Sequence, residues 1–296
     1  HANYVGPKWE TGDAAQTTFT DDGIQKAMLG FLMNETAKGT VDGAAQSRDT
    51  LKKQGKADYR LIAYEGGPSG YDHRNLTNLT SELYGKSEAM AVAALDAWLH
   101  SSAMGYGHQC YLGYSSGYGW SSHTMPEAGG FRAHAGWLAL KMRNQFAAGD
   151  RMILATVTSG PTLLLDKKEW PLVGTYAMAD GAGNYSVFVL SRKLDGSHSG
   201  ADLGDGYTPV TIRLPFTNAQ SISLHKLTKP DGSPADPREN NLEKQKVTIT
   251  SQEVARSALS GAFAINAATG GDERGLPPGA IYLYVFRGCT PSAGRP

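Results

Sequence analysis

The feature that most constrains the fold is a change of pattern near Gly149 and Asp150. Before this point, short apolar runs alternate with stretches that have helical spacing. After it, the apolar runs are short and are separated by turn residues. Alternating strands and helices are typical of a parallel α/β array, whereas successive short strands are typical of antiparallel β structure. The sequence therefore predicts two domains, an α/β domain over residues 1–150 and an all-β domain over residues 151–296.

The first region is expected to contain strands and helices in turn. Asp21 and Asp22 follow Thr20 and precede apolar residues at helical spacing from Ile24, which is typical of a capped helix start. The polar stretch 52–56 is expected to lead into a strand. The other expected elements are a strand end at 2–7, strands at 59–64 and 108–114, and helices at 82–99 and 130–147.

The second region is expected to be a set of antiparallel strands. Val210, Ile212 and Leu214 alternate with polar residues, as in a strand with one buried face. Residues 180–184 (Asp-Gly-Ala-Gly-Asn) predict a hairpin turn, and the proline-containing stretch 229–241 predicts a long exposed loop. Strands are expected at 152–158, 172–178, 185–192, 209–214, 221–227, 246–250 and 280–286.

Charge and cysteine content exclude several classes of function. The 28 basic and 28 acidic side chains cancel, which removes the electrostatic basis for binding nucleic acid or an anionic membrane surface. No run of about 18 apolar residues is present to span a membrane. Cys110 and Cys289 form no Cys-x-x-Cys pair, so a zinc knuckle or redox motif is not predicted. Cys110 is expected to be a buried thiol, and a disulfide with Cys289 stays open.

Glu65 is the main candidate for a functional residue. It ends the apolar run 61–64 and is followed at once by Gly66, Gly67 and Pro68. Residues that follow the strands of a parallel α/β array lie at the edge where such proteins bind ligands. A carboxylate at this edge, beside tyrosine rings, is suited to be the nucleophile of a sugar-cleaving enzyme. The alternative is an acid that caps a turn.

Residues 61–65 (Leu-Ile-Ala-Tyr-Glu) resemble the end of the seventh barrel strand in the clan A retaining glycoside hydrolases. Those enzymes have a (β/α)8 barrel that is often followed by a β-sandwich. The resemblance implies that Glu65 is the catalytic nucleophile and that residues 2–7 correspond to the end of the sixth strand. It also implies the last strands and helices of a (β/α)8 barrel over residues 1–150, followed by an antiparallel β-sandwich over residues 151–296.

The same resemblance implies a sugar-binding rim around Glu65. In the family, an aromatic platform after the eighth strand lines the sugar subsite, and Tyr118 and Trp120 match that platform. Sugars present C–H faces that stack on aromatic rings. The expected substrate-binding residues are Tyr4, Trp9, Glu10, Tyr64, Tyr118, Trp120 and His123. Of these, His123 is expected to donate a hydrogen bond to the sugar, and Glu10 is also a candidate for the second acid.

The chain departs from the family pattern at the general acid/base, which in the family is a glutamate after an asparagine at the end of the fourth strand. The pair Asn34 and Glu35 lies inside a helical pattern, and Glu127 is expected to be a loop acid or helix-start acid. Strands one to five have no counterpart. Since an open sheet edge is normally covered, a preceding segment or a second chain is expected to complete the barrel. The missing strands thus have three explanations: a preceding segment, a second chain, or a protein that binds sugar without cleaving it.

The sequence therefore predicts a secreted or periplasmic retaining glycoside hydrolase that acts on a poly- or oligosaccharide. The alternative is a non-catalytic carbohydrate-binding or assembly subunit. No cofactor is expected, and no metal, because the histidines have no His-Glu-x-x-His spacing. Asp202 and Asp205 are expected in a solvated turn, with calcium binding as the alternative. The sugar, its linkage and exo or endo action stay open.

Overall fold

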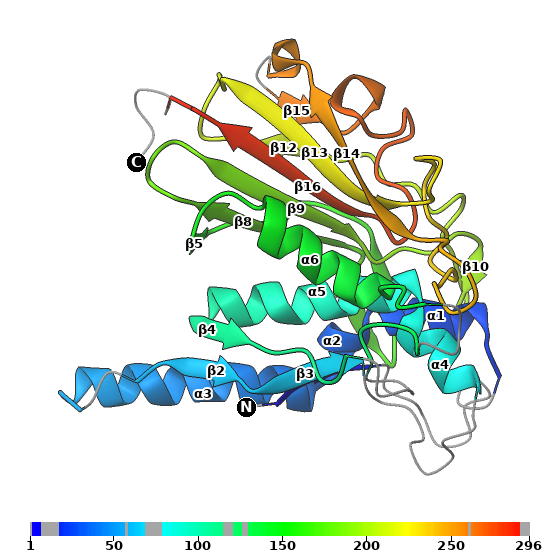
Figure 1. The fold of residues 1–296 in the computed structure, drawn as a ribbon, viewed down its shortest axis with the longest axis horizontal. Helices are drawn as coiled ribbons and strands as arrows, with labels where there is room; N and C mark the ends of the chain where they lie inside the picture. The colour runs from blue at the N-terminus through cyan, green and yellow to red at the C-terminus, as the bar shows by residue number, and fades with distance from the viewer. Residues whose placement is uncertain are drawn as a thin grey trace. The chain divides into compact units, whose positions relative to one another are not determined.

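The computed structural model describes residues 2–6, 18–56, 59–68, 79–114, 121–125, 130–259 and 262–290. The chain forms two compact units, and Figure 1 traces it from one terminus to the other. The first unit contains His1–Ala139 and Arg238–Lys246, and the second contains Leu140–Pro237 and Val247–Pro296. A short piece of the later sequence therefore belongs to the first unit.

The first unit combines parallel strands with helices. Its elements are β1 (Ala2–Val5), α1 (Asp21–Met28), α2 (Gly30–Met33), α3 (Glu35–Lys53), β2 (Leu61–Ala63), β3 (Glu65–Pro68), α4 (Leu79–Lys86), α5 (Glu88–Ala103), β4 (Tyr106–Gln109) and the start of α6 (Ala135–Phe146). β1 pairs in parallel with β3, and β2 pairs in parallel with β4. This parallel pairing between helices confirms the mixed α/β character. The described strands do not close into a barrel.

The first helices begin at capping side chains. The Thr20 hydroxyl accepts a hydrogen bond from the Gly23 N–H at 3.0 Å, so the expected start of α1 is confirmed. α3 runs from Glu35 to Lys53 and so includes the start of the polar stretch 52–56, which the sequence analysis does not assign to a helix. Because Val41 and Ala45 are the buried residues of α3, its helical apolar pattern is weak.

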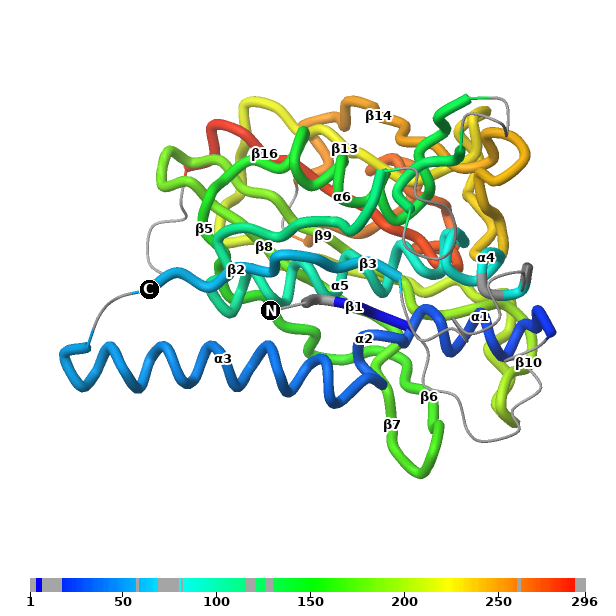
Figure 2. The backbone as a smooth tube through the Cα atoms, turned by 60° about the horizontal axis from the view of Figure 1, so that its bottom comes forward, coloured from blue at the N-terminus to red at the C-terminus, as the bar shows by residue number. Residues whose placement is uncertain are grey.

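α3 is attached to the strands by a small apolar cluster. Val41 of α3 packs with Ala63 of β2 and Tyr106 of β4. Figures 1 and 2 both show α3 running alongside β2 and β3. α3 therefore packs against the strand that ends just before Tyr64.

The helix expected at 82–99 is two helices, α4 and α5. Ser87 separates them, and its hydroxyl accepts a hydrogen bond from the Met90 N–H at 3.2 Å, which caps α5. Most of α5 is buried, and it packs on α1, α2, β1, β3 and β4. A helix that is apolar all round is typical of such a central position. α6 begins at Ala135 rather than near 130.

The segment Arg238–Lys246 is held in the first unit by polar contacts. Arg132 Nε donates to the Asn241 carbonyl oxygen at 3.0 Å, and Asn241 Nδ2 donates to the Ala133 carbonyl oxygen at 2.8 Å. Asn241 is fully buried. The expectation of a long exposed loop over 229–241 is therefore wrong at its end, because these hydrogen bonds satisfy a polar side chain that composition alone assigns to the surface.

The second unit is rich in antiparallel strands. Its strands are β5 (Arg151–Ile153), β6 (Thr162–Leu165), β7 (Lys168–Pro171), β8 (Val173–Ala179), β9 (Tyr185–Ser191), β10 (Ser197–His198), β11 (Ala201–Asp202), β12 (Thr211–Arg213), β13 (Ser221–Thr228), β14 (Thr248–Val254), β15 (Ala262–Ala264) and β16 (Ile281–Arg287). Six of them form one antiparallel sheet in the order β14-β13-β16-β9-β8-β5. Three further pairs are β12 with β15, β6 with β7, and β10 with β11. The predicted β-rich region is confirmed.

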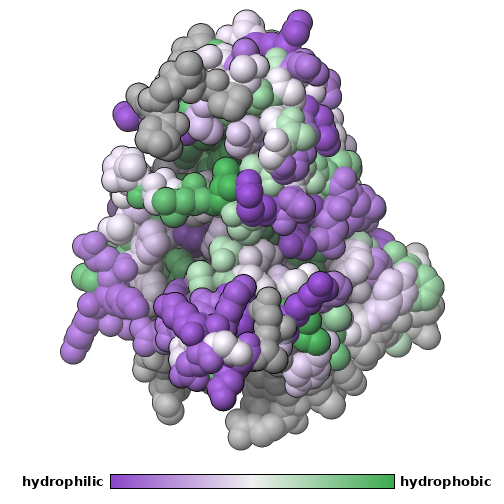
Figure 3. Space-filling model, turned by 90° about the vertical axis from the view of Figure 1, so that its left-hand side faces the viewer, coloured by the Kyte–Doolittle hydropathy of each residue, from purple (hydrophilic) through white to green (hydrophobic). Residues whose placement is uncertain are grey.

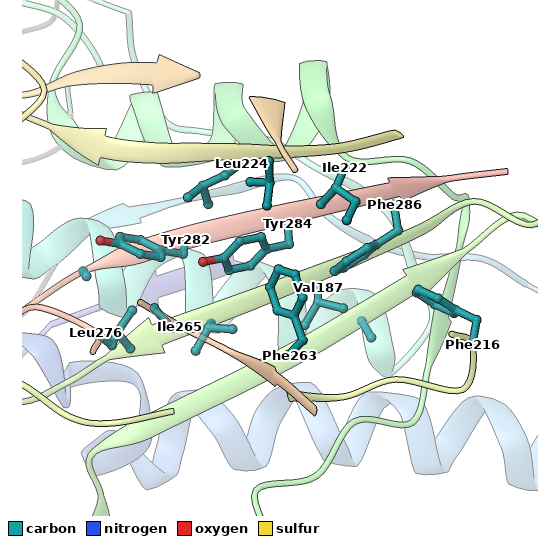
Figure 4. Packing of buried hydrophobic residues seen from close by; sticks show 14 of the residues in the cluster. Val187, Phe216, Ile222, Leu224, Phe263, Ile265, Leu276, Tyr282, Tyr284 and Phe286 are labelled. Carbon is teal, nitrogen blue, oxygen red and sulfur yellow. The ribbon is translucent and has the colours of Figure 1, made fainter. Parts of the chain in front are cut away.

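The core of the second unit lies on one face of this sheet. Tyr284 and Phe286 alternate along β16 and point to the same side as Leu224 of β13 (Figure 4). Phe263 of β15 meets their rings edge-on, with centroids 4.9 Å from Tyr284 and 5.4 Å from Phe286. The β12–β15 pair therefore covers this face of the sheet.

Two local predictions for the second unit are confirmed. Val210, Ile212 and Leu214 all pack against the core cluster. The turn 180–184 joins β8 to β9, and the Asp180 carboxylate accepts a hydrogen bond from the Ala182 N–H at 2.7 Å. A side chain that binds its own turn in this way favours a tight hairpin.

Hydrophilic residues cover much of the face in Figure 3, with smaller hydrophobic areas between them. In the described part of the chain, no helix has the length and hydropathy needed to cross a bilayer. Cys110 and Cys289 are both free, so the disulfide alternative is wrong. Cys110 is exposed rather than buried, because it lies one residue beyond β4, where the strand has ended.

Candidate functional site

Glu65 lies where one parallel strand segment passes into the next. β2 ends at Ala63, Tyr64 forms a bend, and Glu65 is the first residue of β3. Ala2 of β1 is its partner on one side. On the other side the Leu112 N–H donates to the Gly66 carbonyl oxygen at 2.8 Å. The expected strand end followed by a sharp turn is therefore a kink inside a longer paired stretch.

Two tyrosine hydroxyls interact with the Glu65 carboxylate. Burial, followed by the charge of Glu65 and a hydrogen bond to it, raises the pKa of Tyr4 to about 12. A hydrogen bond to Glu65, followed by its charge, also raises the pKa of Tyr64, which is 60% exposed. Both phenols therefore keep their protons at neutral pH and donate to the carboxylate. Such bonds orient a carboxylate before it meets a substrate.

Gly67 explains why glycines follow the acid. Its φ of 141° lies in a region that side-chain-bearing residues rarely adopt. A Cβ atom at this position would lie 3.3 Å from the ring of Tyr111. The Tyr111 ring stacks on Trp98 at 5.6 Å and meets the edge of Trp137 at 5.9 Å. A side chain at position 67 would therefore be strained and would crowd the Tyr111 ring, which lies against this part of the strand.

His123 lies in a second group of rings. Its imidazole centroid is 4.4 Å from the Tyr114 ring and 5.6 Å from the Trp137 ring. Its Nδ1 makes a 2.9 Å hydrogen bond with Ser122 Oγ. The Trp137 ring contacts both His123 and Tyr111, and the Tyr111 ring lies beside Gly67 of β3. These contacts connect His123 with the strand that carries Glu65.

Tyr114 and Phe131 are an exposed aromatic pair that the sequence analysis did not select. Their rings are 5.5 Å apart, and the residues are 57% and 52% exposed. Tyr114 was assigned to the end of a strand, and Phe131 to a helix that in fact begins at Ala135. Because the sequence pattern places both residues inside regular elements, it carries no signal that marks this pair as exposed.

The remaining predicted residues fall into two groups. Trp9, Glu10, Tyr118, Trp120 and Glu127 lie outside the described residues, so their expected roles stay predictions. Asn34 and Glu35 are described, and Asn34 caps α3 through a hydrogen bond from the Ala37 N–H at 3.0 Å.

The acidic residues of the second unit behave as turn residues. Asp202 accepts from the Gly204 N–H at 2.9 Å, and Asp205 accepts from the Tyr207 N–H at 3.1 Å, as expected for a solvated turn. Within the described ranges, no cluster of three or more His, Cys, Asp or Glu side chains is arranged to hold a metal ion.

Comparison with known proteins identifies a fold and no sequence family. No protein-family model and no curated protein matches the chain. The solved structure of AbfB, a family 51 α-L-arabinofuranosidase from Bifidobacterium longum, has a TM-score of 0.61 at 13% identity and covers 97% of this chain and 53% of its own. The GH51 α-L-arabinofuranosidase of Thermotoga petrophila RKU-1 has a TM-score of 0.59 at 12% identity, with 96% and 51% covered.

A second enzyme family has a similar fold. A GH family 44 xyloglucanase from Paenibacillus polymyxa has a TM-score of 0.53 at 10% identity, with 96% of this chain and 45% of that chain covered. The chain therefore spans about half the length of these solved chains. The similarity shows a glycoside-hydrolase-like fold.

Proposed function

We propose that this chain is part of a retaining glycoside hydrolase that acts on a poly- or oligosaccharide, with Glu65 as the catalytic nucleophile. The observation that carries the proposal is the position of Glu65 at the start of the parallel strand β3, beside the phenols of Tyr4 and Tyr64. The similarity of the fold to glycoside hydrolases supports the class of reaction. The finer description, barrel strands followed by a β-sandwich, belongs to the same proposal.

In the proposed reaction, a Glu65 oxygen attacks the anomeric carbon of the sugar. The bond from that carbon to the leaving oxygen breaks, and a second carboxylic acid gives its proton to that oxygen. The second carboxyl group, now ionised, then takes a proton from water. The oxygen of that water attacks the anomeric carbon and displaces Glu65, so both carboxyl groups return to their starting states. A separation of about 5 to 5.5 Å between the two groups suits this sequence of steps.

The second carboxylate is proposed to come from a preceding segment or a second chain that completes a barrel. This chain spans about half the length of the similar solved chains. In addition, β1 and β4 each pair on one side only among the described strands, and unpaired strand edges are normally covered. Secretion or export to the periplasm is part of the proposal, because polymeric sugars are met there.

A mechanism-based fluorosugar tests the nucleophile in the complete assembly. The expected result is a covalent sugar adduct on the peptide that contains Glu65, absent from Glu65→Gln. Activity of Glu65→Gln should fall on the order of 10⁶-fold, as for the loss of a serine nucleophile. Labelling of a different carboxylate, or full activity of Glu65→Gln, would show that the assignment is wrong.

A non-catalytic carbohydrate-binding or assembly subunit is the second candidate. Its support is that the described groups that interact with Glu65 are phenols and not a second carboxylate. Calorimetric titration with oligosaccharides separates the two candidates. Binding without turnover, unchanged in Glu65→Gln, would favour this role over the enzyme. A stable, soluble monomer of this chain alone, seen by size-exclusion chromatography, would count against the partner proposed to complete the barrel.

A further inference from the structure

Lys86 is a fully buried lysine at the end of α4. Its Nζ donates to the Ser121 carbonyl oxygen at 2.6 Å and to Ser121 Oγ at 2.9 Å. A lysine at a helix end normally extends into water. Here both contacts go to a residue 35 positions further along the chain, so the ammonium connects a helix to a distant loop.

Burial of this charge is unfavourable, and its surroundings offset only part of the cost. Burial lowers the pKa of Lys86 to about 8, and the charge of Glu82 opposes that shift. Burial also raises the pKa of Glu82 and lowers the pKa of His134 to about 3, so His134 stays neutral. A buried ammonium is stable in a fold only where its hydrogen bonds are strong and well directed.

The loop that Lys86 holds is the rim segment, residues 121–124. The Ser122 N–H donates to the Gly113 carbonyl oxygen at 3.1 Å, and the His123 N–H donates to the Tyr114 carbonyl oxygen at 2.9 Å. On its other side, the His134 N–H donates to the Ser122 carbonyl oxygen at 2.9 Å. The rim segment therefore lies between the end of the β4 strand region and the residues before α6.

The rim segment also carries the aromatic part of the site. His123 contacts the rings of Tyr114 and Trp137, and Tyr114 contacts Phe131. The Ser122 hydroxyl donates to the Tyr114 carbonyl oxygen at 3.2 Å, which adds a side-chain link to the same residue. A shift of Ser121 would therefore move His123 and the exposed pair Tyr114 and Phe131 together.

We propose that Lys86 is a positioning residue, whose ammonium fixes the rim segment through Ser121 and so sets the orientation of His123, Tyr114 and Phe131 for stacking on a sugar ring. The last part of this inference rests on the proposed function, whereas the positioning itself does not. Lys86 is buried and does not touch the sugar. It acts on binding through the loop.

Amide hydrogen exchange of the full chain tests the positioning without any substrate. In Lys86→Met, which keeps the length of the side chain and removes the donors, the amides of Ser122, His123 and Thr124 are expected to exchange at least tenfold faster. Amides of the six-stranded sheet should be unchanged. Lys86→Arg, which restores donors, should recover part of the protection. Lys53→Met, an exposed lysine of α3, is the matched control and should leave these rates unchanged.

Ser121→Ala is the second variant, because Lys86→Met can unfold the chain. It removes the 2.9 Å contact, keeps the 2.6 Å contact, and should raise the same exchange rates by a smaller factor. Wild-type protection of the rim segment in Ser121→Ala and in a folded Lys86→Met would overturn the proposal. A uniform rise in exchange over the first unit would also overturn it, since it indicates a role in stability alone.

Binding of oligosaccharides then tests the consequence. In Lys86→Met, Kd or KM is expected to rise about tenfold while kcat changes by less than threefold, because Glu65 is untouched. If the rim segment exchanges faster but the sugar affinity is unchanged, Lys86 positions the loop and this positioning does not contribute to binding. If no variant and no wild-type protein binds sugar, the proposed function fails, and the exchange result still decides the positioning.

Discussion

The parallel strands around Glu65 and the six-stranded sheet of the second unit are built in contrasting ways. β16 pairs with β13 and with β9 over six residue positions each, without a register shift. β2 pairs with β4 over three positions, and the register shifts between Leu61 and Ile62. The register of the six-stranded sheet therefore follows one repeating pairing pattern. The register of the short strands at the candidate site depends on individual contacts.

The two units also differ in how many charged side chains they bury. The core of the second unit is a set of aromatic and aliphatic residues that includes Phe263 and Phe286. Among the described residues, the first unit buries the charged side chains of Lys86, Glu88 and Asp96, and the second unit buries that of Arg192. Apolar burial stabilises a region without regard to small changes of geometry, but buried polar groups stabilise it only with correctly placed partners. The contrast teaches that more of the packing in the first unit depends on correctly placed partners for buried charges.

The largest expected effect is a loss of stability on substitution in the apolar core of the second unit. Phe286→Ala removes a fully buried ring that contacts Phe216 and Phe263. We expect the free energy of unfolding to fall by about 3 to 5 kcal/mol. Urea unfolding followed by circular dichroism measures this loss. The control Leu154→Ala, at a residue that is 90% exposed, should change it by less than about 0.5 kcal/mol.

The next prediction concerns pH and the buried Lys86. The pKa of Lys86 is about 8 in the folded state, against 10.5 in the unfolded state. Below pH 8 the Lys86 side chain is charged in both states, so the full cost of burying its charge is present. Above pH 8 the folded state loses its proton first, so the free energy of unfolding rises with pH. Relative to Lys86→Met, the wild type should gain about 2 kcal/mol between pH 7 and pH 9.5.

Chemical denaturation of both proteins at several pH values checks this gain. Glu82 and His134 face Lys86, and His134 stays neutral in this range because its pKa is about 3. Repeating the comparison in a Glu82→Gln background removes the titration of the acid. A difference between wild type and Lys86→Met that is constant from pH 7 to pH 9.5 would mean that the ammonium is not buried as described.

A smaller effect is expected at Gly67. Gly67→Ala requires a side chain at a φ of 141° and a Cβ 3.3 Å from the Tyr111 ring. The free energy of unfolding should fall by about 1 to 2 kcal/mol. The matched control is Gly39→Ala, on α3, where a Cβ meets nothing within 4 Å. This control should stabilise the chain by about 0.5 to 1 kcal/mol, because alanine favours the helix.

The smallest effect is expected for the contacts of Asp42 on α3, one with Lys38 of the same helix and one with His100 of α5. His100 Nε2 and Lys38 Nζ each lie 2.6 Å from an Asp42 oxygen. Burial tends to raise the pKa of Asp42, but the hydrogen bonds from Lys38 and His100 outweigh it and lower the pKa below 3.8. The stability from Asp42 is therefore present above pH 3.8 and is lost as the pH falls through its folded pKa.

We expect Asp42→Asn to lower the free energy of unfolding by about 0.5 kcal/mol at pH 7, since the pair is partly exposed. The difference from wild type should shrink as the pH is lowered toward 2. Thermal unfolding at both pH values measures it. An equal difference at pH 7 and pH 2 would contradict the ionic origin of the contact.

The sequence was most informative where the pattern repeats. The alternation of Val210, Ile212 and Leu214 and the capped start of α1 at Thr20 were predicted because each depends on neighbouring residues. The β6–β7 hairpin was missed because its turn residues Asp166 and Lys167 adopt φ values of 52° and 63°, a conformation usually marked by glycine or asparagine.

The candidate site was only partly predictable. The structure places Tyr4 and Tyr64 next to Glu65, because they lie on a neighbouring strand or adjacent in sequence. Their roles in substrate binding, and that of Glu65 as nucleophile, stay predictions. Lys86 was not selected, since a lysine in the last turn of a helix is normally solvated. Its contact with Ser121 depends on a fold that brings two distant segments together, and no local pattern records that.

The return of Arg238–Lys246 to the first unit has a consequence for how such a chain can be inherited. A recombination event at any position between 150 and 237 would combine the helices and strands around Glu65 with a foreign copy of that segment. If that copy carried a different residue in place of Asn241, the side-chain hydrogen bond to the Ala133 carbonyl oxygen would be lost. The two units therefore cannot be shuffled between genes as independent modules by a single crossover and are expected to travel together.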